Sequence, residues 1–401
     1  MNLMLSGSLL PNTYNAKLTY YTPEFRSRAD FLRAEVWEYF TSGAYGLVMV
    51  GFIFAVLLFL YDVFRKKYNN NTLYITFIFI LVFIYWYMLP YAHRFGRYMM
   101  PVIPFLLLVS ATGFRDFAKL LGGYFKSRNI AVGLSIFALG AVILFSIKDY
   151  NNNKENYAEN CKYISDRQVA AAYWLRDNTK ETDIIATHDV GAIAFYSGRK
   201  IVDVAGLVTP ELITKLNDAN YSIYMAEYMK NSGVTYLAFL RQWYRVANQN
   251  PVFTTADSLP PEEMDVYKFI PEKVHILPKD VNSMILYSFE MLQQKQTQKA
   301  LQVLNQALSR DPKSSVTYYR IAYTYMMMND KANFEKNILK ALKIFPEYKE
   351  ALIQAGFFYK NERKFTDSKS NLEKYISLYP NDKKAAEMLS EVKDSINANK
   401  K

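Results

Sequence analysis

The sequence predicts a membrane α-helical bundle of about four spans, followed by a small α/β domain and an all-α repeat solenoid. Four apolar stretches follow one another before residue 148, helix and strand patterns alternate from about residue 166, and prolines then recur at a fixed interval. We therefore expect an external loop with an interfacial helix at 1–42, transmembrane helices at 43–148, an extracytoplasmic α/β domain at 149–280, and repeats with a capping helix at 281–401.

Bulk composition limits the function classes. Hydrophobic residues make up 51% of the 401, yet the mean hydropathy is only −0.09, which indicates two unlike halves. The net charge is +11, but the basic residues do not cluster on one soluble module, so we expect no nucleic-acid partner. The single cysteine, Cys161, excludes an internal disulfide framework and a cysteine-based zinc site.

An amphipathic helix is predicted ahead of the first apolar stretch. Its apolar residues Leu32, Val36, Tyr39 and Phe40 recur at helical spacing, and acidic residues such as Glu35 occupy positions between them. We expect this helix to lie on the outer interface of the membrane.

The four apolar stretches contain no Asp, Glu, Lys or Arg. Each holds roughly 17–21 residues, close to the number that crosses a ~30 Å hydrocarbon core as a helix. The third contains two prolines, so we expect it to be kinked or to begin as a loop. The stretches are Ala44–Tyr61, Thr72–Ala92, Tyr98–Phe114 and Asn129–Ile147.

Basic residues predict the orientation of these spans. Arg65-Lys66-Lys67 joins the first two, and further basic residues join the last two, so both loops are predicted to be cytoplasmic. The short break that contains His93, Arg94 and Arg97 then faces the other side, as does the chain after Tyr150. We thus expect a multi-pass protein of the cytoplasmic membrane, surrounded by bilayer lipid, with its soluble half extracytoplasmic.

The middle of the chain alternates helical and strand patterns, which predicts a small and mainly parallel sheet. The expected elements are helix Arg167–Asn178, strand Asp183–Thr187, a helical turn at Val190–Tyr196, strand Lys200–Val204, a helix opened by Pro210, and strand Val234–Leu240.

His188 and Asp189 follow the first of these strands. Because α/β folds bind ligands at the carboxyl ends of their strands, this pair is a possible secondary site. The alternative, which we favour, is that Asp189 caps the following helix and that His188 is a loop residue.

Pro312, Pro346 and Pro380 are spaced by 34 residues, the period of tetratricopeptide repeats. Small residues recur where the paired helices of such repeats pack closely, and a polar helix at Lys383–Asn397 would cap the stack. Because these repeats bind peptides or proteins more often than they carry chemistry, we expect a protein partner. The aligned positions are Ser288, Ala322 and Gly356, then Ala300, Phe334 and Ser368, with Phe334 a departure, then Ala307, Ala341 and Tyr375.

Three further stretches share a resemblance. Gly7–Lys17 contains Pro-Asn-Thr-Tyr-Asn-Ala-Lys, Arg97–Pro104 reads Arg-Tyr-Met-Met-Pro-Val-Ile-Pro, and Thr187–Leu207 follows the last span. Together they resemble segments of the bacterial GT-C superfamily of integral membrane glycosyltransferases, across roughly Gly7 to Leu240.

The resemblance implies transfer of sugar from a polyprenyl-phosphate donor on the outer face of the cytoplasmic membrane. The chain departs from the family in two ways. It lacks the early external loop that carries the acidic catalytic residue, and it has far fewer spans. We therefore expect the C-terminal part of such an enzyme, inactive alone, with its catalytic residue unknown. No cofactor is expected, although the complete enzyme could hold a divalent metal.

The role that the resemblance carries over is recognition of the donor phosphate by Arg97, with Arg94, His93 and Tyr98 nearby. A phosphate oxyanion accepts charge-assisted hydrogen bonds, and a guanidinium group offers two of them in a fixed geometry. Alternatively, these arginines extend to lipid headgroups and anchor the helix ends.

Two other functions compete with sugar transfer. The chain could be a membrane-anchored tetratricopeptide repeat protein that recruits cell-envelope partners. It could also be a polysaccharide ligase or polymerase, although the α/β segment around His188 argues against that class.

Overall fold

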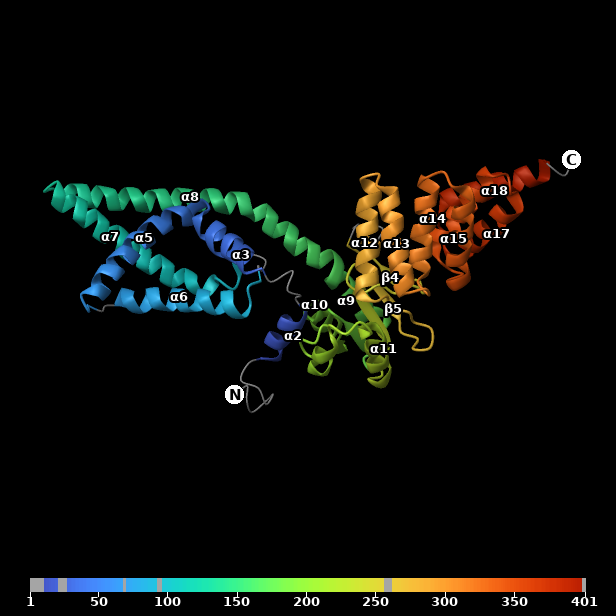
Figure 1. Ribbon diagram of the computed structural model, residues 1–401, viewed down its shortest axis with the longest axis horizontal. Coiled ribbons are helices and arrows are strands. Elements are labelled where there is room, and N and C mark those ends of the chain that lie inside the picture. Colours follow the sequence, from blue (N-terminus) through green and yellow to red (C-terminus); the bar gives the residue numbers. More distant parts are fainter. Residues whose placement is uncertain (1–10, 21–26, 68–69, 92–95, 256–261, 399–401) are drawn as a thin grey trace. The chain divides into compact units, whose positions relative to one another are not determined.

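The computed structural model describes residues 11–20, 27–67, 70–91, 96–255 and 262–398. The chain divides into two compact units, one of Lys17–Lys162 and the other of Met1–Ala16 with Tyr163–Lys401. Figure 1 shows the long helices of the first unit, and the sheet and paired helices of the second.

The described chain has four helices that are long and apolar enough to cross a membrane by length and composition. They confirm the prediction of four apolar helical segments. The helices are α5 (Gly43–Phe64), α6 (Asn70–Met88), α7 (Ile103–Tyr124), which follows a 3-10 turn at Met100–Val102, and α8 (Arg128–Ile164).

The helices differ in length from the charge-free stretches. The third stretch was expected to be kinked or to begin as a loop, and Pro101 lies in a 3-10 turn, after which the α-helix starts at Ile103 and continues to Tyr124. The fourth helix extends past Ile147, because α8 continues to Ile164 through a polar stretch that contains neither proline nor glycine.

The segment before α5 is helical, as expected, and most of its predicted apolar face packs on the buried cluster, namely Val36, Tyr39 and Phe40. It contains α3 (Arg28–Asp30), a π-helix at Phe31–Glu38 and α4 (Tyr39–Thr41). At its start Phe31 and Glu35 are buried, whereas Leu32 is 42% exposed. The wider turn of a π-helix shifts the buried positions there from those that 3.6-residue spacing predicts.

Helices α5 and α7 approach each other through glycines. A Cβ atom on Gly113 would lie 2.0 Å from the carbonyl oxygen of Gly51, so the two backbones are in direct contact there. The hydroxyl of Ser110 donates a hydrogen bond to the carbonyl of Val48 one turn away. Small residues at helix contacts are typical of membrane helix pairs.

The second unit contains a five-stranded sheet of order β2-β1-β3-β5-β4. Strands β2, β1 and β3 are parallel, whereas β5 runs antiparallel to β3 and β4 antiparallel to β5. The parallel part was expected, and the antiparallel edge was not. The strands are β1 (Ile184–Thr187), β2 (Lys200–Asp203), β3 (Tyr236–Leu240), β4 (Phe253–Thr254) and β5 (Met264–Lys268).

Apolar side chains of the helices pack on this sheet. Leu175, Ile185, Ile193, Ala238 and Val266 belong to one buried cluster that joins α9 and α10 to the strands. The helical elements are a π-helical turn at Ser165–Val169, α9 (Ala170–Asn178), α10 (Val190–Ser197), a 3-10 helix at Pro210–Lys215 and α11 (Tyr221–Asn231).

Antiparallel helix pairs follow the sheet (Figure 1). The close-approach role of Gly356 is evident, since a Cβ atom there would lie 2.7 Å from the buried side chain of Leu372. Phe334, the departure from small residues, is fully enclosed and packs on Phe358 at 4.5 Å between ring centroids. The helices are α12 (Lys279–Gln293), α13 (Thr297–Arg310), α14 (Ser315–Met327), α15 (Lys331–Ile344), α16 (Lys349–Asn361), α17 (Phe365–Leu378) and α18 (Lys383–Ala398).

Candidate functional site

Of the residues predicted to recognise a donor phosphate, Arg97 and Tyr98 belong to the described chain, and His93 and Arg94 lie outside it. The Lys17 ammonium donates a hydrogen bond to the Tyr98 hydroxyl at 2.8 Å, and the Arg97 guanidinium carbon lies 5.7 Å from the Tyr98 ring centroid. Lys17 and Tyr98 are 81 residues apart, so the fold brings together the ends of two stretches that carry the GT-C resemblance.

His188 follows β1 and lies in an aromatic enclosure. Its ring centroid is 5.3 Å from that of Tyr244 and 5.8 Å from that of Trp243. Neither ring nitrogen is exposed to solvent or has a hydrogen-bond partner among the described residues. Burial lowers the pKa of His188 to about 3, so the imidazole is neutral at physiological pH. His188 is thus a residue of the loop between β1 and α10, as we favoured, and its ring nitrogens are buried.

Asp189 stands at the N-cap position of α10, but its side chain makes no capping hydrogen bond. The buried side chain of Gln168 instead donates to the Asp189 carboxylate at 2.8 Å. This differs from the expected cap, because an amide from the preceding π-helical turn reaches the carboxylate. His188 and Asp189 do not form a hydrogen-bonded pair.

The loop after β3 joins the α/β domain to the repeats, a feature that the sequence did not predict. The Asn282 side chain donates to the carbonyl oxygen of Gln242 at 2.8 Å, and the Asn250 side chain donates to that of Glu347 at 2.9 Å. The hydroxyl of Ser315 donates to the carbonyl of Ala247. This loop therefore contacts the start of α12, the start of α14 and the turn before α16.

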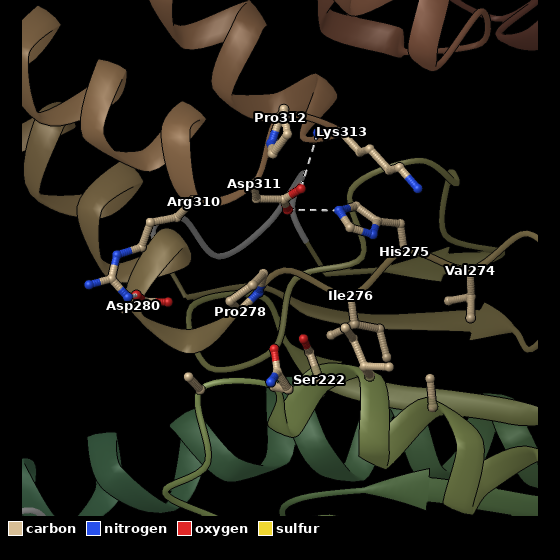
Figure 2. A pocket seen from close by; sticks show the side chains of 14 residues that line it. Ser222, Val274, His275, Ile276, Pro278, Asp280, Arg310, Asp311, Pro312 and Lys313 are labelled. Atoms are coloured by element: carbon tan, nitrogen blue, oxygen red, sulfur yellow. Dashed lines mark hydrogen bonds and ion pairs between the residues drawn. The ribbon is translucent and has the colours of Figure 1, made fainter.

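A second set of contacts lies on another side of the same junction. His275 Nε2 and Asp311 Oδ2 are 2.7 Å apart, and Arg310 pairs with Asp280 at 2.5 Å (Figure 2). These side chains border a cavity of about 650 Å³, which extends to α11 at Ser222. The pairs fix the end of α13 against the chain that leaves the sheet.

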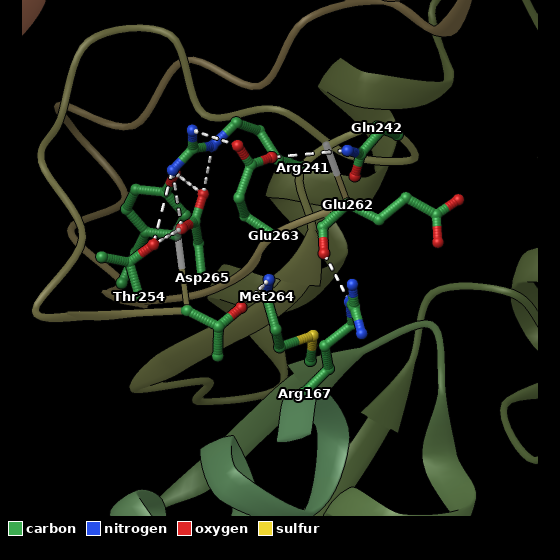
Figure 3. A network of polar contacts seen from close by, with 10 residues as sticks. Arg167, Arg241, Gln242, Thr254, Glu262, Glu263, Met264 and Asp265 are labelled. Atoms are coloured by element: carbon green, nitrogen blue, oxygen red, sulfur yellow. Dashed lines mark hydrogen bonds and ion pairs between the residues drawn. The ribbon is translucent and has the colours of Figure 1, made fainter. Parts of the chain in front are cut away.

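Beneath the loop, Arg241 and Asp265 form a buried ion pair (Figure 3). Arg241 donates two hydrogen bonds to the Asp265 carboxylate, at 2.7 and 2.9 Å, and lies 3.5 Å from Glu263. The Thr254 and Tyr267 hydroxyls donate to the same carboxylate at 2.6 and 2.9 Å. The charge of Arg241 is thus compensated within the domain, and the network fixes the start of the loop on β5.

A cavity of about 430 Å³ opens between this loop and the repeats, and we call it the junction cleft. Its walls come from both modules. It is lined by Arg241, Arg245, Val246, Gln249, Asn250, Pro251, Thr254, Glu263 and Tyr267 of the α/β domain, and by Val316, Phe345, Tyr348, Lys349, Glu350, Ile353, Tyr375 and Tyr379 of the repeats.

Only part of this site is predictable from the sequence. The 34-residue period predicts the repeat wall, because it fixes which helices stand next to one another. The loop wall comes from residues 241–251, which follow a strand and carry two arginines. Within the described chain, no group of three or more His, Cys, Asp or Glu side chains is arranged to hold a metal ion.

Comparison with known families gives two matches. A tetratricopeptide repeat family matches residues 316–348, and a domain of unknown function, DUF8728, matches residues 156–327. The second match runs from α8 through the sheet into α14, across the junction between the two modules. No glycosyltransferase family is among these matches, and no curated protein matches the chain.

Several solved structures that are similar to this chain are tetratricopeptide repeat domains. The first such domain of Spaghetti (RPAP3), bound to an HSP90 peptide, is 18% identical over 30% of this chain and 94% of its own, with a TM-score of 0.28. The corresponding human RPAP3 domain is 17% identical over 30% and 95%, with a TM-score of 0.28. The Sgt2 domain of Aspergillus fumigatus is 20% identical over 31% and 85%, with a TM-score of 0.29.

The family match and the helix pairs agree with the proline period. The chain therefore carries a tetratricopeptide repeat region, preceded by a small sheet domain and by four helices long and apolar enough to span a membrane.

Proposed function

We propose that this protein is a membrane-anchored interaction scaffold whose junction cleft binds a peptide segment of a partner protein. The observation that carries this proposal is the composition of the cleft. One wall comes from the loop after β3 and the neighbouring strands β4 and β5, and the other from α14, α16, α17 and the turns beside them. Stacked repeats present extended binding surfaces, and a second module fixed on such a surface narrows the range of partners.

The contacts at the cleft favour a preformed site. The buried pair of Arg241 and Asp265 and the hydrogen bond from Asn282 hold the loop in place before any partner arrives. A fixed loop loses little conformational entropy on binding, which raises affinity for a given contact area. The cavity of 430 Å³ lies within the ~300–1,000 Å³ range of ligand sites.

The apolar helices α5 to α8 would anchor this module in a bilayer. In the orientation that we expect from the basic loops, the cleft faces the outside of the cytoplasmic membrane, where it would recruit cell-envelope proteins.

Site-specific photocrosslinking tests the proposal. We would place benzoylphenylalanine at Ile353, which lines the cleft, and at Leu339, which is 48% exposed on α15 and does not line it. In native membranes we expect crosslinked partner protein from position 353 and little from position 339. Equal yields from both positions, or none from 353, would contradict the proposal.

A second candidate is the C-terminal part of a GT-C glycosyltransferase. The hydrogen bond between Lys17 and Tyr98 favours it, because it sets two cationic side chains, Lys17 and Arg97, around one ring where a donor phosphate would bind. His93 and Arg94, to which the resemblance gives the same role, lie outside the described residues.

This candidate has its own test. The change Arg97→Ala should weaken binding of polyprenyl phosphate to the purified chain at least tenfold, whereas Arg65→Ala, in the loop after α5, should not. Equal binding by both variants would reject phosphate recognition at Arg97 and would leave the scaffold proposal intact.

A further inference from the structure

We infer that the junction cleft selects a partner segment that carries a carboxylate, and that Arg245 of the α/β domain recognises it. This inference rests on the proposed peptide-binding function and specifies the chemistry of the peptide. The recognising residue lies outside the repeats, so the specificity would come from the domain that is fixed on them.

Arg241 and Arg245 differ in their counter-ions. Arg241 is compensated by Asp265 and Glu263 at 2.7 and 3.5 Å. Arg245, four residues further on, is partly buried, yet within the described chain its guanidinium makes no ion pair and donates no hydrogen bond. Burial lowers the pKa of Arg245, and the nearby charges of Arg241 and Arg320 lower it further. A partly buried cation without a counter-ion has lost some of its hydration, and a bound carboxylate would compensate for that loss.

The charged side chains that line the cleft leave a small positive excess. Three are basic, Arg241, Arg245 and Lys349, and two are acidic, Glu263 and Glu350, so the net charge of the lining is +1. Glu263 is engaged with Arg241, whereas Glu350 makes no ion pair with Arg245 in the described chain. Lys349 lies 4.7 Å from the ring centroid of Tyr379 on the repeat wall.

The repeat wall of the cleft is rich in aromatic side chains, and we call these the aromatic wall. Phe345 and Tyr348 stack at 5.6 Å between ring centroids, and Tyr375 and Tyr379 lie 5.2 Å apart. Such rings bury apolar side chains and methylene groups. An inorganic anion would use only the cations, whereas a peptide with an acidic residue next to apolar ones would use both features. The cleft thus fits an acidic peptide better than a free anion.

An array of random peptides, probed with the full chain in detergent micelles, tests this inference. Each acidic peptide that binds would be compared with its amide counterpart, in which Glu and Asp become Gln and Asn, and with a version amidated at the C-terminus. We expect one of these replacements to weaken binding about tenfold or more. This comparison of acidic and amide peptides uses only the unaltered protein, so its result does not depend on whether a variant folds.

The variant Arg245→Gln should lose the preference for acid over amide while it retains the weaker binding that the aromatic wall provides. The matched control is Arg176→Gln, at an exposed arginine that pairs with its neighbour Asp177 and does not line the cleft. The control should keep the full preference. Thermal unfolding of both variants would show that they are folded, and we expect Arg245→Gln to be at least as stable as the unaltered chain.

The outcomes separate the two proposals. If no peptide binds the unaltered chain, the peptide-binding function itself fails. If peptides bind but acid and amide forms bind equally, or if Arg245→Gln keeps the preference, the scaffold stands and the role of Arg245 is rejected. If inorganic phosphate binds at this site and acidic peptides do not, the inference is also overturned.

Discussion

The side-chain amide of Asn282 donates a hydrogen bond to the main-chain carbonyl of Gln242 at 2.8 Å, and so connects the first repeat helix to the loop after β3. The same amide lies 3.3 Å from the carbonyl oxygen of Arg241. Asn282 is 2% exposed, so its side-chain amide is held within the junction. The repeats and the α/β domain are thus joined by buried polar contacts, which make the shape of the junction cleft a property of both modules.

The change Asn282→Ala should lower the free energy of unfolding by about 1–3 kcal/mol, because it leaves buried carbonyl acceptors without a donor. Chemical denaturation of the full chain in detergent would measure this. Asn371→Ala is the matched control, since that amide is exposed and bonds only within its own helix. A similar decrease in the free energy of unfolding of both variants would show that the contact with Gln242 stabilises the protein no more than an exposed hydrogen bond does.

The ion pair of Arg241 and Asp265 should be far more important to stability than its surface counterparts. Asp265→Asn removes the fully buried carboxylate that accepts two hydrogen bonds from Arg241, leaves only the more distant Glu263 as counter-ion, and should cost about 3 kcal/mol. Asp177→Asn breaks an exposed pair with Arg176 and should leave the unfolding midpoint unchanged. Comparable midpoints for the two variants would contradict the structural role of the buried pair.

Stability should fall at acid pH because of His188. Above its ordinary pKa of 6.5, this imidazole is neutral in both the folded and the unfolded chain. Below that pH the unfolded chain takes up a proton, whereas the folded protein does not until about pH 3. The contribution of His188 to the free energy of unfolding should therefore decrease by about 1.4 kcal/mol per pH unit in this window, or about 2 kcal/mol at pH 5.

Thermal unfolding of the unaltered chain and of His188→Phe, at pH 7.5 and pH 5, would check this expectation. The phenyl ring keeps the contacts with Trp243 and Tyr244 but cannot be protonated. The variant should lose less stability between the two pH values than the unaltered chain does. An identical loss would show that His188 does not stay neutral in the folded protein.

The contact of α5 with α7 should tolerate no side chain at Gly113. Gly113→Ala would place a methyl group 2.0 Å from the carbonyl oxygen of Gly51 and force the helices apart, at a cost of about 1–3 kcal/mol. Gly140→Ala is the control, because a Cβ atom there has no neighbour within 4 Å in the described chain. The unfolding midpoint in detergent should drop for the first variant only, and equal midpoints would argue against this helix contact.

Patterns that repeat along the chain predicted most of the elements. The four apolar stretches identify α5 to α8, and the proline period identifies α12 to α17, because burial of a helix face imposes regular spacing. The parallel strands were also expected. Strands β4 and β5 were not, since β4 has two residues and β5 carries Asp265, whose burial depends on a partner from a distant loop.

The candidate site was harder to anticipate. The 34-residue proline period predicts which helices form the repeat wall. The position of Arg245, however, depends on how the loop after β3 packs on α12 and α14. Such long-range contacts leave no periodic trace in the sequence. The helix that we expected on the membrane interface was also predicted only in part. The π-helix at Phe31–Glu38 buries Phe31 and Glu35, and it departs from the 3.6-residue spacing on which the prediction relied.

The most direct test of the account is whether the two walls of the junction cleft contact the same partner. Photocrosslinkers at Gln249, on the α/β wall, and at Ile353, on the repeat wall, would be activated in native membranes, and the trapped peptides would be identified by mass spectrometry. We predict one partner protein, joined through the same short segment from both positions. Different partners from the two positions, or capture from only one of them, would contradict a cleft shared by both modules.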